Sequence, residues 1–311
     1  MTNLATTPNQ WFKPLPAKPQ ATLRLFCFPY AGGSAQIFRN WSNHLSDTVE
    51  LCPAELPGHG RRRKETPLTD LNELVSALIP IITPYLDKPF AFFGHSMGAL
   101  IAFELTRTLR DRAQPLPTHL FVSGRRSPQF PEDDPPSYNL PDKELIEKLR
   151  WLKGTSSTIL DDPEMMQLML PILRADFEIC ETYQYTEQAP LPCPITAFGG
   201  WRDPASRRGG LKGWREQTSA DFTKKTFPGN HFFLHSAESR LLKYLNKQLS
   251  NSWFSQRNLQ SPKTKSLLTF LESFNSALLR KIKSIAFSLL KRFLKWYSEK
   301  LWQPIIDSSF Q

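Results

Sequence analysis

The sequence predicts an α/β fold in which a mostly parallel sheet is flanked by helices. Short apolar runs with strand character alternate along the chain with segments whose apolar residues have helical spacing. One apolar run leads into residues 94–98 (GHSMG), a G-x-S-x-G pattern centred on Ser96 and followed by a helical segment. Asp203 and His231 come later, each just after another apolar run. Because open α/β sheets build their sites at the carboxyl ends of strands, we expect these three residues at one edge of the sheet.

Composition limits the class of protein. The 311 residues suffice for one large α/β domain with insertions or for two smaller domains. The chain is 40% apolar and 22% charged, which is typical of globular proteins and excludes wholesale disorder. Its four cysteines form no C-x-x-C pair, which favours reduced thiols over a disulfide framework or a zinc site. Residues 1–19 lack the apolar stretch of a signal peptide, and no run of 18 apolar residues occurs, so we expect a cytoplasmic protein.

The first apolar run, residues 23–28, predicts a strand that ends at a glycine-rich loop, residues 30–33 (YAGG). A loop of this kind after an early strand can supply a second backbone donor to an oxyanion site. The donor is expected to be the N–H of Tyr30 or of Ala31. A plain turn would also explain two adjacent glycines.

The middle of the chain continues the alternation. We expect a helix at 35–45, a strand at 49–54, a helix at 71–86, a strand at 89–93, a helix from 99 onward and a strand at 119–123. Successive strand–helix–strand units favour parallel pairing. The glycines on either side of Ser96 are required because side chains there would collide with the neighbouring strand and helix. The turn would aim the Met97 N–H, at a helix N-terminus, toward an oxyanion, unless the pattern is a chance match in a loop.

A basic run, residues 59–63 (HGRRR), follows the second predicted strand. It has two interpretations of equal weight. In the first, the run binds an anionic arm of a substrate through charge-assisted hydrogen bonds. In the second, it is a solvated loop.

Residues 124–141 are rich in Pro, Ser, Asp and Arg and lead into predicted helices at 143–152 and 163–183. The second helix carries more apolar residues, several of them methionine, than one core-facing stripe needs. We therefore expect a lid at about 127–188 whose apolar underside covers a ligand. The alternative is that these helices simply pack on the sheet.

Two further strands, at 193–200 and 222–227, precede Asp203 and His231. A serine hydroxyl is a poor nucleophile near neutral pH, so His231 would take its proton and later return it, while Asp203 would orient and stabilise the imidazole. This arrangement predicts acyl transfer, which with water as acceptor is hydrolysis. His235 is a weaker candidate for the base, and His95 is interpreted as a packing residue. No group of residues has metal-ligand spacing.

The chain resembles the type II thioesterases that accompany nonribosomal peptide and polyketide synthases, a branch of the α/β-hydrolases. The resemblance is carried by residues 28–33, 56–60, 94–98, 121–126, 170–177 and 229–234. It implies an α/β-hydrolase fold with a helical lid, and it implies hydrolysis of acyl thioesters on the phosphopantetheine arm of acyl or peptidyl carrier proteins. It also implies Ser96, Asp203 and His231 as the catalytic triad and favours Ala31, with Met97, as the oxyanion donors. No cofactor is expected beyond the phosphopantetheine of the substrate.

Two positions depart from the pattern of that family. Asn230 stands where a second glycine is usual before the histidine, and Arg202 stands where an acidic residue is common. Neither removes a catalytic group. A general carboxylesterase or lipase, and a module that binds acyl carriers without catalysis, are the alternatives.

The last segment of the chain lies outside the resemblance. We divide the chain into a leader at 1–20, a thioesterase domain at 21–250 and an extension at 251–311. The extension holds ten Lys or Arg against three acidic residues, so it carries +7 of the net charge of +10. Helical spacing of its apolar residues predicts a basic amphipathic helix. Residues 263–302 are expected to bind an anionic membrane surface or an acidic partner, unless they pack on the domain, and no nucleic-acid partner is expected.

Overall fold

A computed structural model describes residues 10–12, 18–130, 135–206 and 209–259. The chain divides into two units, Met1–Trp253 and Phe254–Gln311. The amphipathic helix expected at 263–302 lies outside the described residues. Among the described helices, none has the length and apolarity needed to span a membrane.

Six strands form one parallel sheet in the order β2-β1-β3-β4-β5-β6, which confirms the expected sheet. Their bounds are Leu23–Phe28 (β1), Val49–Pro53 (β2), Phe90–His95 (β3), Leu120–Ser123 (β4), Ile195–Gly200 (β5) and Phe222–Phe227 (β6). Since every pairing is parallel, the carboxyl ends of all six strands meet at the same edge of the sheet.

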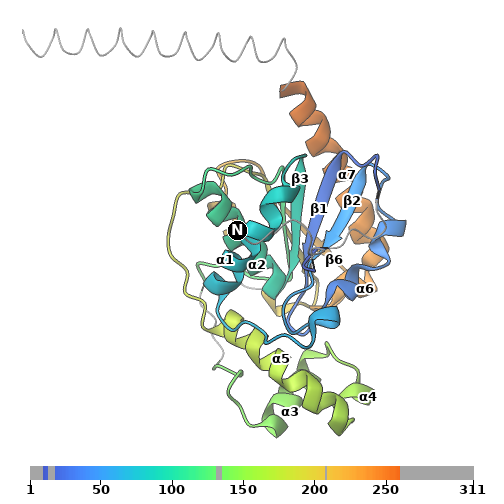
Figure 1. Ribbon diagram of the computed structural model, residues 1–311, viewed down its shortest axis with the longest axis vertical. Coiled ribbons are helices and arrows are strands. Elements are labelled where there is room, and N and C mark those ends of the chain that lie inside the picture. Colours follow the sequence, from blue (N-terminus) through green and yellow to red (C-terminus); the bar gives the residue numbers. More distant parts are fainter. Residues whose placement is uncertain (1–9, 13–17, 131–134, 207–208, 260–311) are drawn as a thin grey trace, which may run out of the picture. The chain divides into compact units, whose positions relative to one another are not determined.

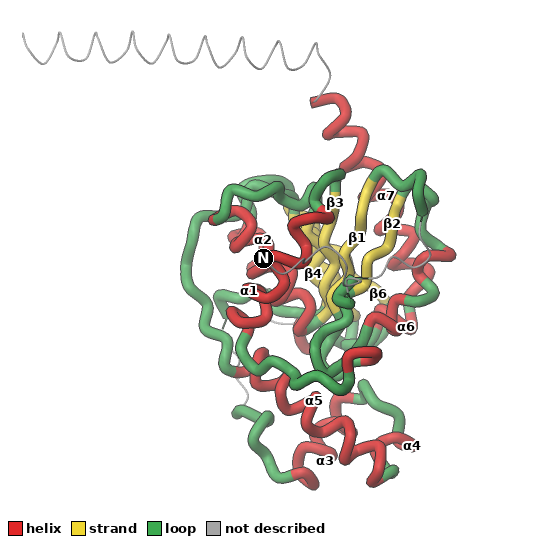
Figure 2. Tube along the Cα trace, in the orientation of Figure 1, coloured by secondary structure: helices red, strands yellow, loops and turns green. Residues whose placement is uncertain are grey.

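Helices cover both faces of this sheet (Figures 1 and 2). Helices α1 (Leu71–Ile82) and α2 (Met97–Asp111) bury their apolar sides against one face. Helices α6 (Phe233–Ser236) and α7 (Glu238–Leu259) contribute to the apolar cluster on the other. The sheet is therefore the middle layer of three.

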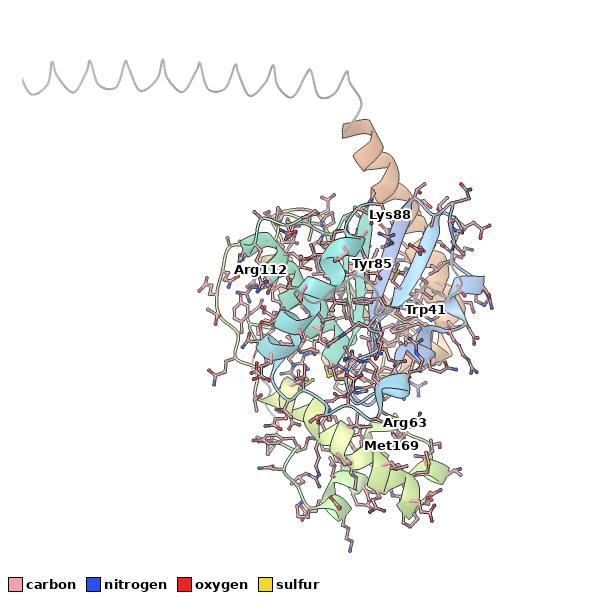
Figure 3. All side chains as sticks on the ribbon, in the orientation of Figure 1. Trp41, Arg63, Tyr85, Lys88, Arg112 and Met169 are labelled. Atoms are coloured by element: carbon pink, nitrogen blue, oxygen red, sulfur yellow. The ribbon has the colours of Figure 1, made fainter. Side chains whose placement is uncertain are left out.

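Side chains of the strands alternate between two separate apolar clusters, as the two-residue period of a strand requires. On β3, Phe90 and Phe92 join the cluster on the side of α1 and α2, whereas Ala91 and Phe93 join the opposite one. Trp41, labelled in Figure 3, packs in the second cluster with its ring 4.9 Å from that of Phe93. Burial on both faces explains why the central strands are apolar almost throughout.

A helical insertion separates β4 from β5. It consists of α3 (Asp142–Leu152), α4 (Ser157–Leu160) and α5 (Pro163–Glu181), which gather at the lower end of the molecule in Figure 1. These helices bury a small apolar cluster of their own, made by Leu145, Leu149, Leu160, Met166, Leu170 and Leu173.

Two predicted helices are wrong in detail. The segment expected to be one helix at 35–45 forms two short 3₁₀ helices, Ala35–Phe38 and Trp41–Asn43, because its aromatic residues pack inward from an irregular path. The helix expected at 71–86 ends at Ile82 and continues as the 3₁₀ turn Thr83–Tyr85, since the proline at position 84 has no N–H with which to continue the helical hydrogen bonds.

Part of the segment assigned to the leader packs on the sheet. Phe12 is buried, and its ring lies 5.1 Å from that of Phe26. The Glu55 N–H also donates to the Trp11 carbonyl at 2.8 Å. A pair of isolated aromatic residues in a polar, proline-containing segment gave no periodic pattern from which this contact could be predicted.

Candidate active site

Ser96 occupies the turn between β3 and α2, with backbone angles φ 54° and ψ −113°. A residue other than glycine rarely adopts positive φ, and the strain persists only where the surroundings fix it. The Ser96 N–H donates to the Ser123 carbonyl on β4 at 2.7 Å. The side chain is partly exposed, so its hydroxyl lies at the edge of the sheet that the sequence indicated.

The two glycines of the turn leave no room for side chains, as expected. A Cβ added to Gly94 would lie 2.0 Å from the Gly98 carbonyl oxygen. One added to Gly98 would lie 2.1 Å from the carbonyl oxygen of Phe28 on β1. Both distances are far below van der Waals contact, so G-x-S-x-G at this turn is a packing requirement of the strand and helix.

Asp203 and His231 meet at the ends of β5 and β6. The Asp203 side chain is fully buried, and its Oδ1 accepts hydrogen bonds from His231 Nδ1 at 3.1 Å and from the Ala205 N–H at 3.0 Å. A carboxylate at Nδ1 fixes the tautomer that carries its proton there, which leaves Nε2 as a proton acceptor. Asp203 Oδ2 is also buried and has no hydrogen-bond partner within the described part of the chain.

His231 lies beside the serine turn. Its ring centroid is 5.1 Å from that of His95, the residue before Ser96. Ser96 Oγ forms no hydrogen bond with the residues that the structure describes, and in ligand-free sites such contacts often shorten only in the complex with substrate. The structure thus brings together the ends of β3, β5 and β6 and with them the three residues that the sequence indicated.

The two competing histidines have other partners. His235 Nε2 lies 3.1 Å from the Tyr30 hydroxyl. His95 is fully buried, and its Nδ1 lies 2.9 Å from the Ser123 hydroxyl. Burial, followed by the repulsion of His231, holds the pKa of His95 well below its usual range, so this ring is neutral. His95 is therefore a packing residue, as expected.

The two departures from the family pattern are accommodated in the loops that carry Asp203 and His231. The Asn230 side chain accepts a hydrogen bond from the Phe232 N–H at 3.0 Å and so stabilises the turn that holds His231. The Arg202 N–H donates to the Gly229 carbonyl at 2.9 Å, which joins the two loops through backbone atoms that any residue supplies.

Two backbone amides, those of Met97 and Ala31, are the candidate donors to an oxyanion. Met97 begins α2, so its N–H lies in the first turn, where amides have no partner within the helix. The loop after β1 turns sharply through a hydrogen bond from the Gly33 N–H to the Tyr30 carbonyl at 2.8 Å, with Gly32 at φ 76°. Ala31 is the residue of this turn whose N–H the family resemblance favours as second donor.

The helical insertion lies directly over these loops. A Cβ added to Gly32 would lie 2.6 Å from Leu173 of α5. One added to Gly154, between α3 and α4, would lie 2.2 Å from the ring of Phe232, which follows His231. Both ends of the site are thus in contact with the insertion.

The basic run after β2 is solvated only in part, and its binding of an anionic arm stays a prediction. His59 and Arg62 are buried and have internal partners, while Arg61 and Arg63 are exposed. His59 Nε2 lies 2.8 Å from Asp176 Oδ2 on α5, and Arg62 Nη1 donates to the Glu55 carbonyl at 3.0 Å.

Asp176 is the buried residue near the site that sequence reasoning missed. It is 1% exposed, and its Oδ2 also accepts a hydrogen bond from the Gly32 N–H at 2.6 Å. A single carboxylate in an otherwise apolar helix face, between Leu173 and Ile179, was the available signal. Buried carboxylates need partners, but the partner cannot be named from the sequence. Among the described residues, no group of three or more His, Cys, Asp or Glu is placed to hold a metal ion.

Comparisons with known proteins show the family of the chain. The thioesterase domain family matches residues 23–249. The gramicidin S biosynthesis protein GrsT of Aneurinibacillus migulanus is 46% identical over 241 residues, which are 78% of this chain and 94% of GrsT. RedJ, the thioesterase of the prodiginine pathway of Streptomyces coelicolor, is 39% identical and has a TM-score of 0.69 over 74% of this chain and 87% of RedJ.

The type II thioesterase BorB of the borrelidin biosynthetic cluster is 36% identical, with a TM-score of 0.71 over 77% of this chain and 97% of BorB. The match extends over nearly the whole length of these relatives, and it covers the strands, the serine turn and the helical insertion. The chain therefore belongs to the thioesterase family, among the type II thioesterases of the α/β-hydrolase fold, and it is a hydrolase that acts on thioesters.

Proposed function

We propose that Ser96, His231 and Asp203 hydrolyse acyl thioesters carried on the phosphopantetheine arm of carrier proteins. The observation that carries the proposal is the hydrogen bond from His231 Nδ1 to the buried Asp203, beside the turn that holds Ser96. Two further solved relatives, ClbQ of the colibactin pathway and YbtT of the yersiniabactin pathway, belong to nonribosomal peptide and polyketide pathways, which supports a carrier protein or synthase as partner.

In the first half-reaction, Ser96 Oγ attacks the carbonyl carbon of the thioester while its proton passes to His231 Nε2. Asp203 stabilises the imidazolium that forms. The carbon–sulfur bond then breaks, and the thiol of the carrier leaves with the proton from His231. The product is an ester between the acyl group and Ser96.

In the second half-reaction, His231 removes a proton from water, which attacks that ester. Ser96 recovers its proton, and a free acid leaves. The N–H groups of Met97 and Ala31 are proposed to bind the oxyanion in both steps, and removing one such donor typically costs about 10²- to 10³-fold in rate.

The insertion, residues 127–188, is proposed to act as a lid over the acyl chain. Its contacts with Gly32 and Phe232, in the loops after β1 and β6, support this role, and so do its methionines. A further proposal from the sequence is that the protein is cytoplasmic and that its basic extension binds a membrane surface or an acidic partner. Deleting residues 255–311 should reduce co-sedimentation with anionic vesicles if residues 263–302 bind a membrane, whereas binding to an acidic protein would leave it unchanged.

Covalent labelling tests the nucleophile. A fluorophosphonate probe should modify Ser96 in the wild-type protein, as located by peptide mass spectrometry, and Asp203→Asn should slow this labelling. Turnover of a short-chain acyl thioester should exceed that of the matching oxygen ester. Absence of label on Ser96 would contradict the proposed mechanism, and faster turnover of the oxygen ester would favour a general esterase.

A further inference from the structure

A buried ion pair adjoins the loop that is proposed to bind the oxyanion. Asp176, on α5, accepts two hydrogen bonds through the same oxygen, from the Gly32 N–H at 2.6 Å and from His59 Nε2 at 2.8 Å. The side chains of His59 and Asp176 are 3% and 2% exposed. The mechanism above uses neither of them.

The partners of His59 determine its charge. Its Nδ1 lies 2.9 Å from the Pro57 carbonyl oxygen, which can only accept, and its Nε2 faces the carboxylate of Asp176. Both ring nitrogens therefore donate, which makes the ring a cation. Burial by itself would lower the pKa of His59, but the hydrogen bond and charge of Asp176, with smaller contributions from Pro57 and Glu55, raise it above its usual value.

A second buried carboxylate holds the far end of the same loop. Glu55, after β2, accepts a hydrogen bond from the Ala35 N–H at 3.2 Å. Glu55 also accepts from Arg61 Nε at 3.4 Å. The loop from Tyr30 to Ala35 is thus fixed at its middle by the insertion and at its end by the sheet.

The bond from Gly32 restricts the peptide plane between Ala31 and Gly32. Without it, this plane would be free to rotate, because glycine tolerates both signs of φ. The Ala31 N–H belongs to the preceding peptide plane, which joins this one at the Ala31 Cα, so a shift of Gly32 that moves this Cα would also displace the Ala31 N–H. Leu173, one turn before Asp176 on α5, packs against Gly32 and further limits the loop.

We propose that Asp176, held in its charged form by His59, is a positioning residue for the oxyanion loop, residues 30–35. The position of the Ala31 N–H then depends on how α5 packs against this loop. This inference rests on the proposed function, in which Ala31 supplies an oxyanion donor. Helix α5 also carries much of the apolar cluster of the insertion. A ligand that changes the packing of the insertion would therefore also change the position of the oxyanion loop.

The test compares Asp176→Asn with a matched variant, Glu181→Gln, on the same helix. Glu181 likewise accepts backbone hydrogen bonds, from Ser137 and Tyr138 at 2.6 and 3.0 Å, but these belong to the loop before α3 and not to the oxyanion loop. With a short acyl thioester of N-acetylcysteamine, Asp176→Asn should lower kcat roughly 10- to 100-fold, less than outright loss of a donor, because the oxyanion exists only in the transition state. KM should stay within about twofold, and Glu181→Gln should keep the wild-type kcat.

A second measurement distinguishes a displaced Ala31 N–H from a loss of folding. An alkylboronic acid adds to the serine and places a tetrahedral oxygen where the oxyanion forms, so its inhibition constant should weaken by about the same factor as kcat falls. If Asp176→Asn does not fold, His59→Gln replaces it, since Gln keeps one donor for Asp176 and should show a smaller loss of kcat with KM unchanged. An inactive wild type would overturn the proposed function and this inference together. Equal kcat losses in Asp176→Asn and Glu181→Gln, or unchanged boronate binding, would overturn the positioning role alone.

Discussion

The sheet body and the helical insertion bury their apolar side chains in different ways. The body places large aromatic residues in two clusters on opposite faces of the sheet, with Phe93 and Phe121 fully buried. The insertion buries only a small cluster around Leu170 and leaves Trp151 and Leu168 69% and 70% exposed.

This difference indicates that the body and the insertion differ in rigidity. Regions with few buried apolar contacts open at lower free-energy cost than the core does. We therefore expect the body to keep Ser96, Asp203 and His231 at fixed relative positions and the insertion, proposed as a lid, to adapt to a ligand. Helix α5 belongs to both, because Leu173 packs in the insertion cluster and Ile179 packs in the core of the body.

The largest effect should come from Asp203, which is fully buried in the body. Asp203→Asn should lower kcat by about 10³- to 10⁴-fold, because the amide stabilises the wrong tautomer of His231 and no longer stabilises the imidazolium. Steady-state kinetics with an acyl thioester would measure this, with circular dichroism as the control for folding. A loss of less than tenfold would remove Asp203 from the mechanism.

A pair of core truncations tests the stability contrast directly. Phe93→Ala should lower the free energy of unfolding by about 3–5 kcal/mol, because its ring packs between Trp41 and Phe38 and leaves a cavity that cannot collapse. Leu160→Ala in the insertion should cost about 2 kcal/mol, near the lower end of the range, since a small cluster can relax around the gap. Urea unfolding of both variants gives the comparison. Equal costs would mean that the insertion is as tightly packed as the body.

The pH dependence of stability reports how well the body excludes water. Burial lowers the pKa of His119 to about 4. In the unfolded chain the residue takes up a proton below about pH 6.5, whereas the native ring stays neutral until about pH 4. Stability should therefore decrease as the pH falls through this interval. His119→Gln should show a shallower decrease between pH 6.5 and 4.5 in urea titrations, and a slope identical to that of the wild type would show that the ring is hydrated in the native state.

The smallest effect on stability should come from the exposed side of the insertion. Leu168→Ser should change the free energy of unfolding by less than about 0.5 kcal/mol, because the side chain is mostly in solvent already. KM for a carrier-bound acyl chain should rise several-fold if this surface contacts the ligand or carrier. KM for a short N-acetylcysteamine thioester should not change. An equal rise in KM for both substrates would mean that Leu168 lies near the reacting atoms, which would contradict its assignment to the exposed side of the insertion.

Much of the fold could be predicted because its signals are local. The strands alternate apolar side chains with a period of two between buried faces, and the G-x-S-x-G pattern marks the turn at Ser96 within five residues, although Gly98 is required by its contact with Phe28 on β1. The order of Ser96, Asp203 and His231 along the chain, each after a strand, predicts that all three lie at one edge of the sheet.

The remaining features depend on contacts between distant segments. His59 and Asp176 are 117 residues apart, so neither residue reveals the partner that makes it buried and charged. The irregular path of residues 35–45 likewise follows from where Phe38 and Trp41 must pack, and tertiary packing overrides the local helical pattern there.

Intact-mass spectrometry of an acyl-loaded carrier protein tests the central claim most directly. The wild-type protein should convert the acyl carrier to the free phosphopantetheine thiol form, with loss of the acyl mass. Ser96→Ala should leave the acyl carrier unchanged over the same time, while its thermal unfolding midpoint matches that of the wild type. Deacylation by Ser96→Ala at the wild-type rate would contradict the account.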